Sequence, residues 1–159
     1  MPERPVTHAT FCIERTYPAS PERVFTALSD PAAKAKWFSG PPDWAREPHE
    51  MDFRVGGRER LVNLPPDKPA HVFDAVYQDI VPNERVIFSY DMHIGEARIS
   101  VSLTTIELRP AGTGTKLLFT EQGAFLDGFD DPKVREIGTN ALLDALGASL
   151  EAPGSPGTS

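Results

Sequence analysis

One carboxyl group stands out among the residues that could do chemistry, because its neighbours in the sequence place it on an apolar face. Glu121 follows Leu117 and Phe119 at two-residue spacing, and alternate residues of a β-strand point to the same side of a sheet. We therefore expect Glu121 to point inward, where full burial raises a carboxyl pKa by about 3–5 units. Tyr90 or an arginine such as Arg54 is the candidate partner, and the hypothesis is that Glu121 orients a polar group of a ligand. If the strand instead ends one residue earlier, the carboxylate is solvated.

Aromatic and aliphatic side chains accompany this carboxyl group on other strand-like stretches. Alternation predicts two further sets that share one face: Phe88, Tyr90 and Met92 in one stretch, and Ile99, Val101 and Leu103 in another. These sets either fill a close-packed core or line a hollow with few polar groups. The residues that we expect to contact a ligand in the second case are Trp37, Phe38, Trp44, Phe53, Phe88, Tyr90, Met92, Val101, Phe119, Glu121, Leu142 and Leu146.

Three of these aromatic residues flank a proline-rich loop at residues 39–48. Large aromatic side chains suit contact with a ligand, and near a cavity mouth they would form a lid. For Trp37 and Phe38 we favour packing of a short helix against the sheet. Trp44 lies among the prolines of the loop and is the better candidate for a lid.

Other residue types used in catalysis or metal binding occur without the partners that such chemistry needs. None of the four histidines, His8, His49, His71 and His93, forms an HExxH pair, and no cysteine cluster accompanies them. Cys12 has no motif around it, and no GxSxG sequence is present. We therefore expect no metal, no cofactor and no recognisable catalytic residue.

The composition is that of one soluble globular domain. The chain has 159 residues, of which 40% are hydrophobic and 25% charged. Its net charge of −7 argues against binding to nucleic acid or to anionic membranes, which require basic patches. The single cysteine excludes an internal disulfide. No signal peptide and no apolar run long enough for a membrane span is seen, so we expect a cytoplasmic protein.

The longest helical pattern covers residues 131–151, and the rest of the chain is mostly strand-like. Ile137, Ala141, Ala145 and Leu146 recur at three- and four-residue spacing and predict the buried face of this helix. Gly138 and Gly147 lower helix propensity by roughly 1 kcal/mol each. They make sense where another chain segment or a ligand approaches the helix closely.

The remaining elements follow in a simple order. A strand at residues 7–17 precedes two short helices at residues 20–30 and 32–38, and turn residues then separate six strand candidates. Those candidates cover residues 49–55, 58–64, 70–81, 84–94, 97–108 and 115–122. Such a meander is typical of antiparallel pairing, and its concave face needs cover from the long helix. The predicted class is α+β, with a flexible start at residues 1–7, one domain at 8–151 and a disordered tail at 152–159.

This order resembles the START-like, helix-grip (SRPBCC) superfamily, and local sequences resemble the group similar to the activator of the heat-shock-protein-90 ATPase. The stretches that carry the resemblance are PASPERVFTALSDPAAKAKWF at 18–38, FRVGGRER at 53–60, VPNERVIFSY at 81–90, TEQGAFLDGFDD at 120–131 and ALLDALGASL at 141–150. The resemblance implies a curved antiparallel sheet wrapped round the C-terminal helix, with an internal cavity that is often apolar. It does not imply a reaction.

Three functions fit these expectations. The first is binding of a small hydrophobic or amphipathic molecule in a cavity between the sheet and the C-terminal helix. The second is an enzyme of the cyclase, dehydratase or isomerase type on the same cavity, for which Glu121 is the acid–base candidate. The third is a co-chaperone-like protein-interaction module, which predicts a filled interior and an exposed apolar patch. The sequence leaves the oligomeric state open, a homodimer included.

Overall fold

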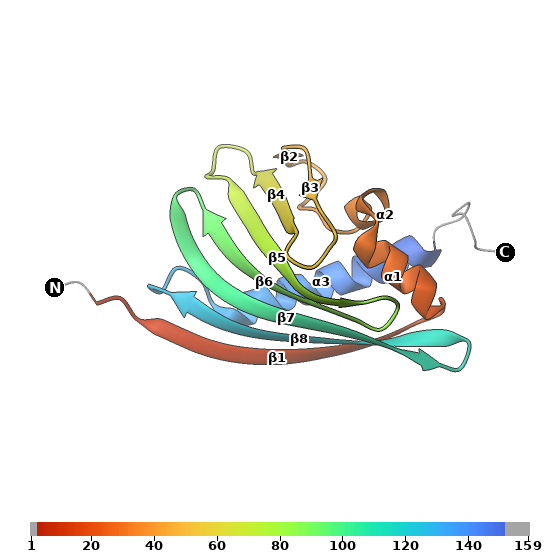
Figure 1. Cartoon of the computed structure of the whole chain (residues 1–159). Helices are drawn as coiled ribbons and strands as arrows, with labels where there is room; N and C mark the ends of the chain where they lie inside the picture. Colours follow the sequence, from red (N-terminus) through yellow and green to blue (C-terminus); the bar gives the residue numbers. More distant parts are fainter. Residues whose placement is uncertain (1–2, 152–159) are drawn as a thin grey trace.

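The computed structural model describes residues 3–151 and consists of one curved sheet and three helices (Figure 1). The elements in chain order are β1 (Val6–Tyr17), α1 (Pro21–Ser29), α2 (Pro31–Ala35), β2 (Ala45–Arg46), β3 (Glu50–Met51), β4 (Arg58–Leu64), β5 (His71–Val81), β6 (Arg85–Ile94), β7 (Ala97–Ala111), β8 (Gly114–Leu126) and α3 (Pro132–Glu151). Residues 1–2 and 152–159, which include the predicted C-terminal tail, lie outside the described residues. No helix within residues 3–151 is both long and apolar enough to cross a membrane.

All the strands belong to one antiparallel sheet, in which most neighbours in sequence are also neighbours in space. The order is β1-β8-β7-β6-β5-β4-β2, and β3 also pairs with β4. Only the β1–β8 pair joins distant parts of the chain, across twelve residues of each strand. Figure 1 shows the sheet curving round α3, with α1 and α2 at one end of that helix. The predicted helix-grip architecture is confirmed.

The two short helices begin and end where their capping residues predict. Ser20 accepts a hydrogen bond from the amide of Arg23, and Pro21 takes the first position of α1. Asp30 ends α1 and caps α2, because its side chain accepts from the third residue of the next helix, and Pro31 takes the first position there. This compact pair places α2 against the sheet.

The N-terminal half of the sheet differs from the sequence prediction at its edge. The predicted loop at residues 39–48 contains the two-residue strand β2, and only Glu50 and Met51 of the predicted strand at residues 49–55 pair with β4. Pro48 separates the two short strands and has no amide proton for a ladder. The predicted flexible start also contains the first two residues of β1, Val6 and Thr7.

The buried face of α3 is not the one that the periodicity predicts. The buried residues are Thr139, Leu143, Leu146 and Leu150. Ile137 is 69% exposed and Ala141 is also exposed. Both faces carry apolar residues, but the leucine face removes more apolar surface from water, at roughly 25 cal/mol per Å². Leu146 is the one fully buried residue of the predicted face, and Ala145 and Leu142, which the same pattern places on that side, are partly buried and pack against the core.

The two glycines of α3 occupy different surroundings. A Cβ at Gly147 would lie 2.9 Å from a ring carbon of Tyr17. The Tyr17 hydroxyl donates to the Leu143 carbonyl at 2.7 Å and holds the tyrosine side chain against the helix at this point. The close neighbour of Gly147 is therefore a side chain, and neither another backbone segment nor a ligand. Gly138 has no atom within 4 Å of a Cβ position and borders open space.

A β-bulge in β7 changes which residues face the interior. Met92 pairs with Ser100 and His93 with Arg98, so Ile99 is the extra residue between them. An extra residue reverses the alternation that follows, which places Ser100 inward and Val101 outward. The expectation that Val101 shares the inner face with Ile99 is therefore wrong.

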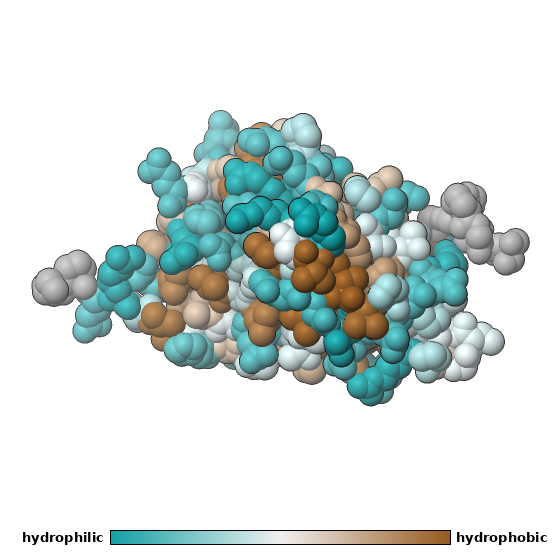
Figure 2. Space-filling view, viewed as in Figure 1, coloured by the Kyte–Doolittle hydropathy of each residue, from teal (hydrophilic) through white to brown (hydrophobic). Residues whose placement is uncertain are grey.

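Exposed large apolar side chains include two groups, besides the single residues Val6, Val55 and Leu64. Val101 and Leu103 are exposed on β7, and Phe129, Val134 and Ile137 are exposed around the start of α3. In the view of Figure 2, apolar side chains gather over the middle of the sheet among polar surroundings.

Candidate ligand-binding cavity

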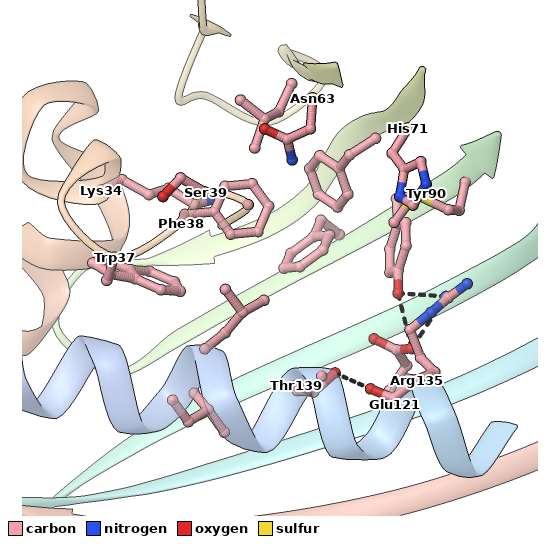
Figure 3. A pocket seen from close by; sticks show the side chains of 18 of the residues that line it. Lys34, Trp37, Phe38, Ser39, Asn63, His71, Tyr90, Glu121, Arg135 and Thr139 are labelled. Carbon is pink, nitrogen blue, oxygen red and sulfur yellow. Dashed lines mark hydrogen bonds and ion pairs between the residues drawn. The ribbon is translucent and has the colours of Figure 1, made fainter. Parts of the chain in front are cut away.

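A cavity of about 410 Å³ lies between the concave face of the sheet, α3, and the segment that runs from α2 to the loop after it. Its volume is in the range of pockets that hold small molecules. The predicted residues that line it are Trp37, Phe38, Trp44, Phe88, Tyr90, Met92, Phe119, Glu121 and Leu142. Of these, Figure 3 labels Trp37, Phe38, Tyr90 and Glu121, whose side chains point toward a common space between the helices and the sheet.

Three of the predicted residues lie elsewhere. Phe53 packs edge-on against the rings of Phe25 and Tyr77, at centroid distances of 5.7 and 4.9 Å. Leu146 belongs to the packed core beyond the cavity. Val101 lies on the outer face of the sheet because of the bulge in β7.

The two tryptophans have different surroundings, which bear on whether each packs in the core or forms a lid. The Trp37 indole N–H donates to the Ala27 carbonyl at 2.9 Å, and the residue is buried. Trp44 is half-buried, with its ring 5.2 Å from the ring of His71. Both line the cavity, and a lid role for Trp44 stays a prediction.

One end of the cavity carries a polar cluster centred on Glu121, which points inward and is 2% exposed. Tyr90 donates its hydroxyl proton to Glu121 Oε2 at 2.9 Å, and Thr104 donates to Oε1 at 3.0 Å. Arg135 of α3 donates to the Tyr90 hydroxyl and to Asp130, both at 2.9 Å. We call these five residues the Glu121 cluster.

Burial raises the pKa of Glu121 and outweighs the opposing effects of Tyr90, Arg135 and Thr104. The Arg135 guanidinium is 3.8 Å from the carboxylate and is shared with Asp130, which is closer. Burial and the neighbouring Glu121 also raise the pKa of Tyr90, so its hydroxyl keeps its proton. The cluster therefore presents a carboxyl group that takes up a proton readily and lies beside an apolar cavity.

Arg135 lines the cavity and is a candidate site residue that sequence reasoning did not find. The predicted arginine, Arg54, forms an exposed ion pair with Asp52 at 2.8 Å and does not reach Glu121. Arg135 precedes the buried Thr139 by one helical turn, and this four-residue spacing is the signal that could have identified it.

The other polar cluster comprises Lys34, Glu59, His49 and Tyr77 and was not predicted. The Lys34 ammonium donates to Glu59 Oε1 at 2.6 Å, and the Tyr77 hydroxyl donates to the same oxygen. A His49 ring nitrogen lies 2.7 Å from Glu59 Oε2. We call these four residues the Lys34 cluster. Glu59 alternates with Leu61 in β4, and that spacing is the signal for an inward carboxylate here.

The pKa of Glu59 is shifted in the opposite direction to that of Glu121. Burial by itself would raise it, but the charge of Lys34 and the hydrogen bonds from His49, Lys34 and Tyr77 prevail and lower the pKa to about 2. Burial and the Glu59 charge raise the pKa of Tyr77. The Lys34 cluster therefore holds a buried, ionised pair at neutral pH.

Among residues 3–151, no group of three or more His, Cys, Asp and Glu side chains could hold a metal ion. The polar side chains that line the cavity include the Arg135 guanidinium, the Lys34 ammonium, the His71 imidazole, and the carboxyl groups of Asp130 and of Glu121, whose pKa is raised.

Comparison with known proteins gives matches over nearly the whole chain. Residues 18–151 match the family model "Activator of Hsp90 ATPase homolog 1-like protein". A solved structure from Rhizobium leguminosarum is 46% identical over 94% of this chain and 98% of its own, with a TM-score of 0.89. The protein Mll3558 from Rhizobium loti is 50% identical over 91% and 99%, with a TM-score of 0.85. The protein CV1439 from Chromobacterium violaceum is 31% identical over 90% and 97%, with a TM-score of 0.75. No curated protein matches the chain.

Proposed function

The chain belongs to the family of Activator of Hsp90 ATPase homolog 1-like proteins, and from this premise and the cavity we propose that it binds a small, largely apolar molecule between the sheet and α3. Family membership supports a ligand-binding or cyclase-like role in general. The partner in this proposal is a hydrophobic or amphipathic molecule encountered in the cytoplasm.

The observation that carries the proposal is the hollow interior itself. Protein interiors are normally packed to crystal-like density, so a space of about 410 Å³ lined by aromatic rings requires an explanation. Phe73, Phe88 and Phe119 supply apolar contact area, and Tyr90 and Glu121 supply a few polar groups. This composition is typical of small-molecule sites. The protein-interaction alternative predicts a filled interior, which the space between the sheet and α3 does not favour.

The Glu121 cluster would orient the ligand in this proposal. Tyr90 and Arg135 are fixed by their mutual hydrogen bond, and Glu121 is fixed by Tyr90 and Thr104. A polar ligand group that meets these atoms finds them already in place, which reduces the entropy lost on binding.

Native mass spectrometry of gently purified protein, compared with the denatured mass, tests the proposal. We expect a reproducible extra mass that is lost on denaturation and that corresponds to a compound able to fit the cavity. The Glu121→Gln variant should carry less of it or release it at a different pH. An apo mass, together with no uptake of any apolar compound added in excess, would contradict the proposal; the same spectra report the oligomeric state.

A second candidate function is an enzyme of the cyclase, dehydratase or isomerase type. The observation that favours it is the raised pKa of Glu121, since a general acid–base needs a pKa close to the working pH. Turnover of the compound found by mass spectrometry, lost in Glu121→Gln while binding persists, is the expected result for an enzyme. Release of the compound unchanged after prolonged incubation would favour binding alone.

A further inference from the structure

The ammonium group of Lys34 is held inside the apolar cavity with incomplete hydrogen bonding. Lys34 is 5% exposed, and its side chain lines the cavity. An ammonium has three N–H donors, but within residues 3–151 its only oxygen partner is Glu59 Oε1. Its nitrogen lies 4.5 Å from the ring centre of Phe38 and 5.9 Å from that of Phe88. Ring faces are weaker partners for a cation than an oxygen atom, so the Lys34 ammonium can still donate a hydrogen bond to an oxygen of a ligand.

The charges around Lys34 determine which kind of oxygen fits best. Glu59 is ionised and balances the ammonium charge, and Tyr77 is neutral because its pKa is raised by burial and by Glu59. A ligand carboxylate beside Lys34 would also lie close to the Glu59 carboxylate, and like charges in a buried site repel each other. A neutral oxygen atom of a ligand can accept hydrogen bonds from the remaining N–H groups of Lys34 without that repulsion.

The position of Lys34 relative to the Glu121 cluster adds a second condition. Figure 3 shows Lys34 approaching from α2 on one side of the cavity, and Tyr90, Glu121 and Arg135 on the other, with aromatic side chains between them. A molecule that fills the space therefore meets a polar group at each end and rings along its body.

We propose that Lys34 contacts the ligand directly, and that the ligand is a neutral aromatic or polycyclic molecule with a carbonyl-type oxygen that accepts a hydrogen bond from the Lys34 ammonium. This inference rests on the proposed binding function and names the ligand class for the same cavity. Glu59, His49 and Tyr77 hold the ammonium in position and do not contact the ligand oxygen.

Equilibrium dialysis with three naphthalenes of similar shape tests the inference. Acetylnaphthalene carries the ketone oxygen, ethylnaphthalene lacks it, and naphthoate carries a full negative charge. A hydrogen bond to a charged donor contributes enough to favour the ketone over the ethyl compound by about tenfold or more. We expect the wild-type protein to show this preference and to bind naphthoate more weakly than the ketone.

The decisive variant replaces both members of the ion pair, Lys34→Met with Glu59→Gln, because a single replacement leaves a buried charge without its partner. We expect this double variant to bind the ketone and the ethyl compound equally, with affinity for the ethyl compound within about twofold of wild type, since the apolar contacts remain. Lys36→Met, which changes an exposed lysine on the next turn, should keep the preference. Glu121→Gln, which alters the other cluster, should weaken binding of both neutral compounds to a similar extent and so leave their ratio unchanged.

The outcomes separate the inference from the function on which it rests. Equal binding of both neutral compounds by wild type would overturn the role of Lys34 and leave ligand binding intact. A preference lost in Glu121→Gln but kept in the double variant would place the oxygen at the other cluster and overturn the inference. If the wild-type protein bound naphthoate more tightly than the ketone, and the double variant lost this preference, the inference that the ligand oxygen is neutral would be overturned. No uptake of any of the three would contradict the binding function as well.

If the double variant does not fold, a second measurement tests the inference. It is the carbonyl stretching frequency of acetylnaphthalene bound to the wild-type protein and to Glu121→Gln. A hydrogen bond from an ammonium lowers this frequency relative to an apolar solvent, and we expect the lowering in both proteins. A frequency equal to that in apolar solvent would overturn the inference.

Discussion

Glu59 and Glu121 are two carboxylates buried to a similar degree in one sheet, and their pKa values move in opposite directions. They are 1% and 2% exposed, and burial is the largest effect on both. Glu59 has an ammonium at 2.6 Å and two further donors, whereas Glu121 has two hydroxyl donors and a guanidinium at 3.8 Å that is shared with Asp130. The partner at hydrogen-bond distance, and not the depth of burial, therefore decides in which direction each carboxyl pKa moves.

Because of this difference, the two carboxyl groups can serve different purposes in the same cavity wall. A permanently ionised pair, as in the Lys34 cluster, fixes α2 to β4 and β5 and holds its charges in place. In the Glu121 cluster the carboxyl group has a raised pKa, so it holds its proton more tightly than an ordinary glutamate does. The predictions that follow test this division.

The largest expected effect is on stability when Lys34 is replaced alone. Lys34→Met leaves the Glu59 carboxylate buried without its counter-charge, which typically costs about 3–5 kcal/mol. Urea unfolding at pH 7 should show this loss in free energy of unfolding, and exposed Lys36→Met should stay within about 0.5 kcal/mol of wild type. A loss below about 1 kcal/mol for Lys34→Met would break the comparison, because the ion pair would then not govern Glu59.

The second prediction concerns the stability of the fold at low pH. The folded-state pKa of Glu59 is about 2, below its ordinary value of 4.5, so its ionised form stabilises the fold above pH 4.5. This contribution, roughly 3 kcal/mol, is lost as pH falls through that window. Urea unfolding between pH 6 and 2.5 should therefore show a steeper acid loss in wild type than in the Lys34→Met, Glu59→Gln double variant. Parallel curves for the two proteins would contradict the lowered pKa.

The two tyrosine hydroxyls offer a matched comparison of intermediate size. Tyr77→Phe removes a hydrogen bond to an ionised carboxylate, which contributes about 1.5–3 kcal/mol. Tyr90→Phe removes one to a carboxyl group with a raised pKa and should cost about 1 kcal/mol at neutral pH. Thermal or urea unfolding of both variants at pH 6 shows which substitution lowers the free energy of unfolding more. Equal losses would mean that the two carboxylates have the same charge at that pH.

The smallest effect is expected for Glu121→Gln, and it should have the opposite pH dependence to that of Glu59. Because burial raises the folded-state pKa of Glu121, the proton is held more tightly in the folded state, and wild type loses stability as pH rises from the ordinary pKa through the raised one. The variant does not ionise, so its stability relative to wild type should rise over this interval. Unfolding curves from pH 4 to 8 measure the difference, and a constant offset would show that the pKa is unshifted.

Sequence reasoning found one of these carboxylates and missed the other for a physical reason. Glu121 follows two apolar residues at strand spacing, whereas Glu59 has charged Arg58 and Arg60 on either side and looks like part of a solvated hairpin. The partners of Glu59 come from α2 and from the segment after β2, about 25 and 10 residues away in sequence. Periodicity within one strand contains no information about such partners.

The cavity-lining residues were predicted best where the strands are regular. Phe88, Tyr90 and Met92 alternate along β6 and line the cavity as expected. The prediction that Val101 faces the cavity was wrong because the bulge at Ile99 reverses the alternation, and no glycine or proline marks that bulge in the sequence. On α3, Ile137 failed because two apolar faces compete for burial, and only packing against the sheet selects one.

The sequence by itself determined the order of elements, the helix caps, the family and the inward direction of Glu121, since each depends on local spacing or on a contiguous motif. The tertiary structure alone decided that the interior is hollow, that Arg135 and not Arg54 reaches Tyr90, and that Lys34 and Glu59 form a buried pair. These features join residues from separate strands and helices, and their distances depend on the curvature and register of the whole sheet. The charge state of each carboxylate follows from those distances, so it too is a property of the fold.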